Sequence, residues 1–322
     1  MGANPSMINV LIIGCGNIGA FYDWETDDIR TYAKAFHVSG VNLFVFDSNS
    51  DKSEKVGRRY GARILKRWDE IPPNTYEIVV ISSPTSTHFS YLTSLLPNPP
   101  SLVICEKPVD LDFVRLTKLK AQYDKGRARV MVNFHRRFQP SMIALAKRVQ
   151  KIEEQDRCQT AVVSYQRGFH NNASHAMDLL GLLFGKPFNP SEVALLNARR
   201  DEFVEDPTMT VACMWNGIQV IFVGLIGASF SHFEISLYFS KHAIELRQVC
   251  NVVEFFSAQA QTDAFYPDLR SDELWTDTLN DQMKKVAEHA LWMVNDPSVE
   301  DNFLESIELS RTIVSLSKGK TS

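Results

Sequence analysis

The sequence lacks the features that mark membrane-spanning, secreted and nucleic-acid-binding proteins. No window approaches about 18 uninterrupted apolar residues, so we expect no transmembrane helix. The N-terminus has no basic segment followed by an apolar one, so we expect no signal peptide. Lys and Arg number 34 against 38 Asp and Glu. The resulting net charge of −4 gives no basic footprint for nucleic acid or an anionic membrane.

Paired cysteines are also lacking. The chain has five widely spaced cysteines and no Cys-x-x-Cys motif, so we interpret them as buried free thiols rather than disulfides or zinc ligands. We find no clustering of His, Cys and carboxylates at metal-ligand spacing and therefore predict no metal site. Apolar residues make up 44% and charged residues 22%, which is typical of a globular enzyme, and we expect a cytoplasmic one.

The first part of the chain alternates strand-like and helix-like runs. A length of 322 residues suggests about two domains, and the alternation is typical of a twisted parallel sheet. We predict an α/β fold with a dinucleotide-binding, doubly wound Rossmann domain over residues 1–132. Its strands are expected at residues 8–13, 41–46, 76–82, 101–105 and 128–132.

A Gly-x-Gly-x-x-Gly turn follows the first predicted strand. Its glycines are Gly14, Gly16 and Gly19, and Asn17 and Ile18 lie between the last two. Such glycines allow a sharp turn and a close approach of backbone N–H groups to a pyrophosphate. We therefore predict that these five residues bind a dinucleotide. The alternative is a plain strand–turn–helix, because the motif alone is a weak signal.

Asp47 ends the second predicted strand. A carboxylate there can accept hydrogen bonds from both hydroxyls of a ribose and repels a 2′-phosphate, which favours NAD over NADP. The alternative is an aspartate that caps the next helix. Basic residues just beyond keep NADP open as the cofactor: Lys52, Lys55, Arg58 and Arg59.

The turn after the third predicted strand holds Ser83, Thr85 and His88. Ligands of open parallel sheets sit beyond the carboxyl ends of the strands, so we assign these residues to the cofactor site. For His88, a local role in capping or packing against the next helix is the stronger alternative.

Several motifs resemble one known family when their order and spacing are taken together. Besides the glycine turn, they are the stretches 83–88, 106–108, 133–140 and 174–180. In these motifs the chain resembles the Gfo/Idh/MocA family of NAD(P)-dependent sugar and cyclitol oxidoreductases.

The resemblance implies a central role for Lys107. It implies a cis peptide before Pro108 and places Glu106 and Lys107 at the cofactor. We also assign Arg136 to the cofactor, because its planar fork could reach it; an interdomain salt bridge is the equal alternative. Burial and the positive nicotinamide would both disfavour a charged ammonium. Lys107 would then hydrogen-bond the reacting hydroxyl and share its proton. The alternative is a surface lysine after an edge strand.

The resemblance also implies that His175 takes or gives the proton. A near-neutral pKa suits histidine to this exchange, although a histidine satisfied by a neighbour at a domain junction is the alternative. Asp178 lies three residues later on the same helical face, where it could orient the ring. We assign Asp178 to substrate binding.

One position departs from the family. Many members have Asp four residues before this histidine, whereas this chain has Asn171, followed by Asn172. An amide cannot act as a general base but can hydrogen-bond a sugar, so we assign both residues to substrate binding. Arg137 is assigned there too, for an anionic group; an interdomain salt bridge is its equal alternative.

The second half is rich in alternating strands. We predict an α+β domain over residues 133–322 with a large open, mostly antiparallel sheet, a helix over 174–184, and two C-terminal helices over 274–294 and 300–317. Strands are expected at 159–166, 192–197, 209–215, 219–225, 234–240, 243–248 and 252–257.

We place seven aromatic residues among the candidates for the face of this sheet opposite the helix: Phe222, Phe230, Phe233, Tyr238, Phe239, Phe255 and Phe256. An exposed apolar sheet face marks a partner surface, so we predict a homodimer or homotetramer.

The sequence therefore predicts an NAD(P)-dependent oxidoreductase. It would transfer a hydride between nicotinamide and a hydroxyl or ketone of a sugar, nucleotide sugar or cyclitol. The alternative is a non-catalytic regulatory protein of the same fold that binds NAD(P) or a sugar, because Asn171 stands where many relatives have Asp. A weaker alternative is a reductase of a non-sugar carbonyl or imine.

Overall fold

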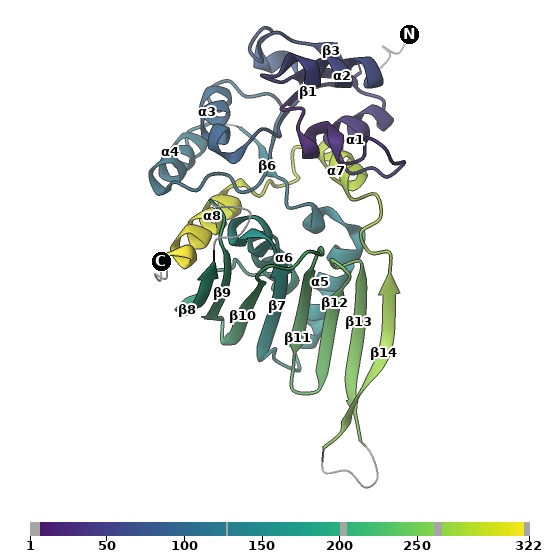
Figure 1. Ribbon diagram of the computed structural model, residues 1–322, viewed down its shortest axis with the longest axis vertical. Coiled ribbons are helices and arrows are strands. Elements are labelled where there is room, and N and C mark those ends of the chain that lie inside the picture. Colours follow the sequence, from purple (N-terminus) through teal and green to yellow (C-terminus); the bar gives the residue numbers. More distant parts are fainter. Residues whose placement is uncertain (1–6, 127, 200–204, 261–265, 319–322) are drawn as a thin grey trace. The chain divides into compact units, whose positions relative to one another are not determined.

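The computed structural model describes residues 7–126, 128–199, 205–260 and 266–318 (Figure 1). They form two compact units. Unit 1 comprises residues 1–138 and 281–308, and unit 2 comprises residues 139–280 and 309–322. The segment 281–308 thus returns to unit 1 after the chain has built most of unit 2.

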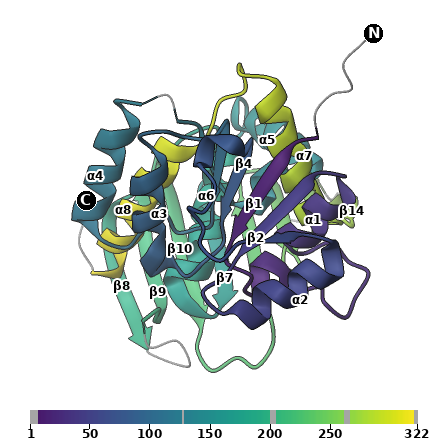
Figure 2. The same cartoon turned by 90° about the horizontal axis from the view of Figure 1, so that it is seen from above.

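Unit 1 contains a six-stranded parallel sheet in the order β3-β2-β1-β4-β5-β6. The strands β2, β1 and β4 lie side by side in Figure 2. The order runs outward in both directions from β1, which confirms the predicted doubly wound Rossmann fold. The strands are β1 (Asn9–Ile13), β2 (Asn42–Phe46), β3 (Arg63–Ile64), β4 (Ile78–Ile81), β5 (Leu102–Cys105) and β6 (Val130–Val132).

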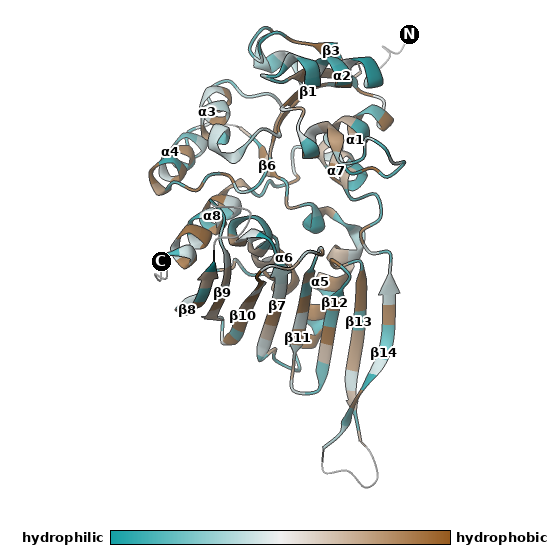
Figure 3. Ribbon diagram, viewed as in Figure 1, coloured by the Kyte–Doolittle hydropathy of each residue, from teal (hydrophilic) through white to brown (hydrophobic). Residues whose placement is uncertain are grey.

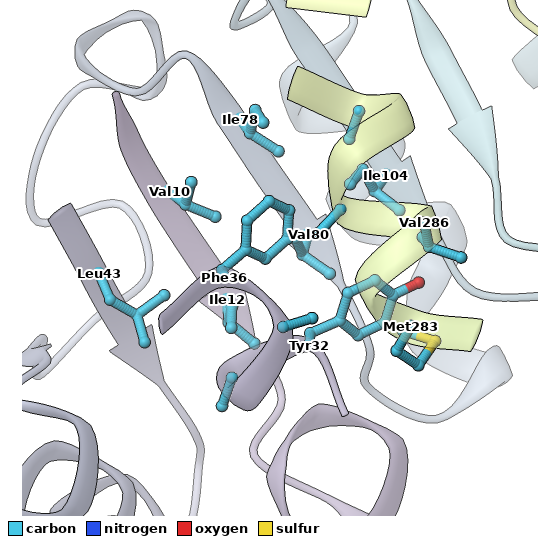
Figure 4. Packing of buried hydrophobic residues seen from close by; sticks show 14 of the residues in the cluster. Val10, Ile12, Tyr32, Phe36, Leu43, Ile78, Val80, Ile104, Met283 and Val286 are labelled. Carbon is cyan, nitrogen blue, oxygen red and sulfur yellow. The ribbon is translucent and has the colours of Figure 1, made fainter. Parts of the chain in front are cut away.

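The core of unit 1 joins the sheet to α1 (Tyr32–Val38) and α7 (Gln282–Asn295) (Figure 4). Val10 and Ile12 of β1 share this cluster with Phe36 of α1 and Met283 of α7. The remaining helical segments of unit 1 are η1 (Asn17–Phe21), α2 (Ser50–Tyr60), η2 (Pro73–Thr75), α3 (Thr85–Leu95), α4 (Phe113–Tyr123) and η3 (His135–Phe138).

Unit 2 contains an eight-stranded sheet in the order β14-β13-β12-β11-β7-β10-β9-β8. Only β7 and β10 pair in parallel, and the other neighbours are antiparallel, as the sequence predicts. The strands are β7 (Thr160–Gln166), β8 (Ser191–Arg199), β9 (Thr208–Trp215), β10 (Ile218–Leu225), β11 (Phe233–Tyr238), β12 (His242–Arg247), β13 (Val252–Gln259) and β14 (Asp268–Thr276).

The helical segments of unit 2 are α5 (Pro140–Glu153), η4 (Gly168–Ala173) and α6 (Ser174–Phe184), and a last helix, α8 (Phe303–Ser317), ends the described chain. Burial alternates along β10. Every second residue from Ile218, including Val220 and Phe222, is buried, and the residues between them are half-buried or exposed. Hydrophobic stretches recur along the strands of this sheet in Figure 3, whereas most of α2 of unit 1 is hydrophilic. One face of the sheet therefore packs against protein within unit 2, and the other is more open.

The prediction for the aromatic residues is wrong in most cases. Phe222, Phe233, Phe239 and Phe255 are all buried. The ring of Phe222 contacts Phe169 in η4 at 6.1 Å and Phe188 at 5.9 Å between centroids. Strand parity puts Phe222 on the packed face with Val220. Of the predicted aromatic face, only Phe230 and Tyr238 are exposed, and Phe256 is half-buried.

The helix predicted from residue 274 begins later. Leu274 belongs to β14, an edge strand paired with β13, and α7 begins only at Gln282. Nearly every side chain of β14 is exposed, so this strand lacks the alternation that identifies a half-buried strand. In the described part of the chain, no helix is both long enough and apolar enough to cross a membrane.

Candidate functional site

The carboxyl ends of five neighbouring strands in unit 1 bring most of the predicted cofactor residues to one edge of the sheet. In the order β2, β1, β4, β5 and β6, the residues that follow are Asp47, Gly14, Ser83, Lys107 and Asn133. Parallel strands are spaced about 4.8 Å apart, so three spacings separate the ends of β2 and β5 by about 14 Å. A ligand can therefore lie along this edge with different chemical groups at each strand end.

A cleft of about 500 Å³ opens at this edge. Six of the predicted cofactor residues line it: Gly14, Gly16, Asn17, Ile18, Asp47 and Ser83. The other residues that line the cleft include Tyr22, Lys52, Thr87 and Tyr91. A volume of this size is in the range of small-molecule and cofactor sites.

Close packing explains the third glycine of the turn. A Cβ at Gly19 would lie 2.1 Å from the carbonyl oxygen of Gly14, so no larger residue fits without moving the backbone. The glycine turn enters the short helical segment η1, where the Ala20 amide donates to the Gly16 carbonyl at 2.8 Å. The first amides of such a segment have no acceptor within it, and here Asn17 and Ile18 line the cleft. This arrangement fits the diphosphate of a dinucleotide.

Asp47 is bonded to the glycine turn itself. Its Oδ2 accepts a hydrogen bond from the Cys15 amide at 2.7 Å, and its Oδ1 accepts one from the Asn49 amide at 2.8 Å. Each carboxylate oxygen has a second lone pair, so the ribose role and the helix-entry role can coexist. Burial, and then the Asp47 charge, raise the pKa of the Cys15 thiol to about 12, which disfavours the thiolate.

The turn after β4 is held by His88. This ring is 1% exposed, with Nε2 2.9 Å from the Ser83 carbonyl and Nδ1 3.1 Å from the Pro108 carbonyl. His88 thus connects the turn after β4 to the turn after β5. Thr85 is the first residue of α3, and the hydroxyls of Ser83 and Thr87 are 2.6 Å apart.

The peptide between Lys107 and Pro108 is cis, as the family resemblance implies. The neighbouring Glu106 carboxylate accepts hydrogen bonds from the Tyr32 hydroxyl at 2.7 Å and the Asn133 side-chain amide at 2.9 Å. The sequence reading did not assign Tyr32, because it lies at the start of α1, 74 residues from Glu106. Tyr32 and Asn133 fix the residue that precedes Lys107.

Cationic groups surround the end of β6. Burial, and then the charges of Arg136 and Lys107, lower the pKa of His135 well below its usual value. His135 is therefore neutral near pH 7 and lies near Lys107. Arg136 is buried, whereas Arg137 forms an ion pair with Glu305 at 3.0 Å within unit 1.

The predicted substrate residues other than Arg137 lie in unit 2. His175 and Asp178 are buried in the first turns of α6, at 8% and 6% exposure. Asn171 is exposed in η4. The side-chain amide of Asn172 instead donates to the carbonyls of Gln166 and Arg167, so it closes the turn that precedes α6. Burial lowers the pKa of the neighbouring His170, and the Asp206 charge opposes that effect.

The sequence reading left Tyr91 out of the site. It lies on α3, and its ring meets Trp68 edge-on at 5.5 Å between centroids. Burial, and then the Asp47 charge, raise the pKa of Tyr91. Tyr91 lies in the second turn of α3, outside the motif at residues 83–88, so no local signal indicates its place at the cleft.

Comparison with known proteins supports this organisation. Residues 8–134 match the model of the Gfo/Idh/MocA oxidoreductase family with NAD-binding Rossmann fold. Inositol 2-dehydrogenase of Rubrobacter xylanophilus is 30% identical over 153 residues, which cover 46% of this chain and 41% of that protein. The aligned region thus spans about two fifths of the curated relatives that it matches.

Solved structures extend the likeness of fold to nearly the whole chain. A myo-inositol dehydrogenase from Corynebacterium glutamicum has a TM-score of 0.73 at 18% identity and covers 98% of this chain and 96% of its own. A levoglucosan dehydrogenase in complex with NADH has a TM-score of 0.76 at 15% identity and covers 97% and 96%. The chain is thus similar to the Gfo/Idh/MocA oxidoreductases in its N-terminal, NAD-binding region, and it shares the fold of the solved structures over nearly its whole length.

Proposed function

We propose that the protein is an NAD(H)-dependent oxidoreductase that exchanges a hydride with a hydroxyl or ketone of a cyclitol or sugar. One observation supports this above the others. Asp47, the glycine turn and Lys107 follow β2, β1 and β5 along one edge of the unit 1 sheet, and the glycine turn and Asp47 line one cleft. A dinucleotide needs this order of groups, from ribose to pyrophosphate to the reacting end.

Different residues of unit 1 would bind different parts of the dinucleotide. The amides of Asn17 and Ile18 would hold the diphosphate, and Asp47 would accept hydrogen bonds from the ribose hydroxyls. A bound nicotinamide supplies the hydride exchange itself. NADP remains open, because Lys52 lines the same cleft as Asp47 and could hold a 2′-phosphate.

Proton transfer is the task of Lys107 and His175 in this proposal. Lys107 would hydrogen-bond the reacting oxygen, aided by the fixed Glu106 that precedes it. His175 would take or give the proton that accompanies the hydride. Asn171, Asn172, Arg137 and Asp178 stay proposed substrate residues. The side chains of Asn172 and Arg137 already bind groups of the protein, so they have the fewest hydrogen-bonding groups available for a substrate.

The names of the relatives support a choice of substrate class. Inositol 2-dehydrogenases are among the curated proteins that match, and a levoglucosan dehydrogenase shares the fold. We therefore propose a cyclitol such as myo-inositol, or a related sugar, as substrate, with nucleotide sugars as a further group to screen.

The test is a spectrophotometric screen. The protein is mixed with NAD⁺ or NADP⁺ and a panel of inositols, hexoses, anhydrosugars and nucleotide sugars, and reduced nicotinamide is followed by absorbance. We expect turnover with at least one polyol. Lys107→Ala should lower kcat by about 100-fold or more, since a positioned proton donor contributes about 10²–10⁴-fold. Its dissociation constant for NADH should change little.

Two results would contradict the proposal. Full activity of Lys107→Ala would remove that residue from the reaction. Tight NADH binding without turnover on any panel member would instead favour a regulatory protein that senses the cofactor, which is consistent with Asn171 replacing the family's usual acid.

We also propose that the protein forms a homo-oligomer through the open face of its unit 2 sheet. On that face Ile221 pairs with Val162 and Ala212, all three half-buried and apolar. The exposed Tyr238 and the half-buried Phe256 lie on the same face, so the patch has both aliphatic and aromatic side chains. Light scattering at micromolar concentration would measure the mass, and a monomer would contradict this proposal.

A further inference from the structure

Four consecutive backbone amides in η4 donate to one neighbouring segment of unit 2. The Gly168 amide donates to Thr208 Oγ1 at 3.2 Å, and the Phe169 amide to the Pro207 carbonyl at 2.9 Å. The next two donate to one carboxylate: His170 to Asp206 Oδ1 at 2.6 Å and Asn171 to Asp206 Oδ2 at 2.9 Å. Amides in the first turn of a helical segment have no acceptor within it, and here residues 206–208 supply the acceptors for all four.

Gly168 makes room for this carboxylate. A Cβ at Gly168 would lie 2.1 Å from Asp206 Oδ2, and the residue has φ of +61°, a region that side-chain-bearing residues rarely adopt. Both the backbone conformation and the space therefore depend on glycine. The contact between Gly168 and Asp206 is a second, independent sign that the carboxylate has a defined position.

A hydrogen bond links the position of η4 to the start of α6. The carbonyl of Asn171 accepts a hydrogen bond from the hydroxyl of Ser174, the first residue of α6, at 2.9 Å. His175 is the next residue. A shift of the Asn171 backbone would therefore move both the exposed Asn171 side chain and the start of the helix that carries His175.

We infer that Asp206 is a positioning residue, which holds η4 so that Asn171 and His175 keep the places the reaction needs. It touches neither the substrate nor the cofactor in this assignment and acts through the two amides that it binds. The inference rests on the proposed function, since it takes Asn171 and His175 to act on the substrate.

The test compares Asp206→Asn with a matched control, Asp156→Asn. Asp156 also lies in unit 2 and also accepts two backbone amides, from Ser240 at 2.9 Å and Lys241 at 2.8 Å, but it holds the β11–β12 hairpin. In both variants one oxygen becomes an NH₂ group that cannot accept, so one backbone amide loses its acceptor.

We expect Asp206→Asn to lower kcat/KM for the polyol by about 10- to 100-fold, because a displacement of about 1 Å at reacting groups costs this much. Its dissociation constant for NADH should stay within about twofold of wild type. Asp156→Asn should lose comparable thermal stability yet keep kcat/KM within about twofold. Equal kcat/KM values for the two variants would overturn the inference. Gly168→Ala, which puts a methyl group against the same carboxylate, should reproduce the kinetic defect.

Hydrogen exchange measured by mass spectrometry separates this inference from the proposed function. If the wild-type protein turns over no substrate, the proposed function fails while the contact can still be examined. Faster exchange over residues 168–175 in Asp206→Asn, but not in Asp156→Asn, supports the positioning role. Equal exchange in wild type and both variants overturns it.

Discussion

Two turns of this protein are each held by a carboxylate from another segment, and they differ in how visible that carboxylate is in the sequence. In unit 1, Asp47 binds the Cys15 amide of the glycine turn. In unit 2, Asp206 binds the amides of His170 and Asn171. Asp47 follows a buried strand behind a glycine motif, whereas Asp206 lies outside any motif. A carboxylate that accepts the backbone amides of a turn can thus be predicted from the sequence only where it lies next to a known motif.

The two turns also differ in whether their carboxylates can bind a ligand in the cleft. Asp47 lines the cleft, so its remaining lone pairs can face a ligand. Asp206 likewise accepts one backbone amide on each oxygen, but it is about 20% exposed and does not line that cleft. The comparison predicts that Asp47 variants change cofactor binding and that Asp206 variants change substrate turnover.

The largest expected effect comes from the glycine turn. Gly19→Ala puts a Cβ 2.1 Å from the Gly14 carbonyl, so the backbone must move away from its place beneath the cleft. We expect NADH affinity to fall by about 100-fold or more, which corresponds to about 2.7 kcal/mol. Isothermal titration calorimetry measures it. Wild-type affinity in a folded Gly19→Ala protein would show that the turn does not carry the diphosphate.

An intermediate effect is expected at Asp47. The variant Asp47→Ala removes the carboxylate that repels a 2′-phosphate, while Lys52 stays in the cleft. The ratio of the NADPH and NADH dissociation constants should fall by about tenfold, close to the 1.4 kcal/mol of one charged hydrogen bond. Titrations of both cofactors against both proteins give this ratio. An unchanged ratio would show that Asp47 does not select the cofactor and only accepts the backbone amides of the turn.

The first domain was predictable because its signals are local. Val10 to Ile13 form a continuous apolar run before the glycines, and β1 pairs with β2 and β4 as such a run implies. The turn that carries Lys107 was placed by its motif. By contrast, the burial of Phe222 depends on strand parity against η4, and the contacts of Glu106 with Tyr32 span 74 residues. No local pattern reports such long-range partners.

β14 shows a second limit. Its side chains are exposed on both faces, so the residues 268–276 satisfy no strand periodicity, and Leu274 was assigned to the helix that starts at Gln282. The pairing of β14 with β13 also shifts its register between Phe255 and Phe256. Edge strands are held by a neighbour rather than by their own apolar pattern.

The smallest expected effect concerns a third carboxylate-held turn, which gives the baseline for the comparison. Burial of Asp156 opposes ionisation, but hydrogen bonds from Ser240, His242 and Lys241 outweigh it and lower the pKa of Asp156 to about 2. A lowered native pKa stabilises the fold above the unfolded value near 3.8, and this stabilisation is lost as pH falls from about 4 to about 2.

The melting temperature of wild type should therefore fall more steeply across this pH interval than that of Asp156→Asn. Scanning calorimetry at several pH values compares the two. Parallel curves would show that Asp156 is not protected from protonation, and would weaken its use as a control for Asp206.

NADH titration of three proteins tests the division between the two turns most directly. Wild type, Asp47→Ala and Asp206→Asn are titrated by calorimetry under one condition. We predict that Asp47→Ala binds NADH about 10- to 100-fold more weakly, as expected for the loss of hydrogen bonds to a charged group. Asp206→Asn should bind it as wild type does. Equal weakening in both variants, or none in Asp47→Ala, would contradict the account.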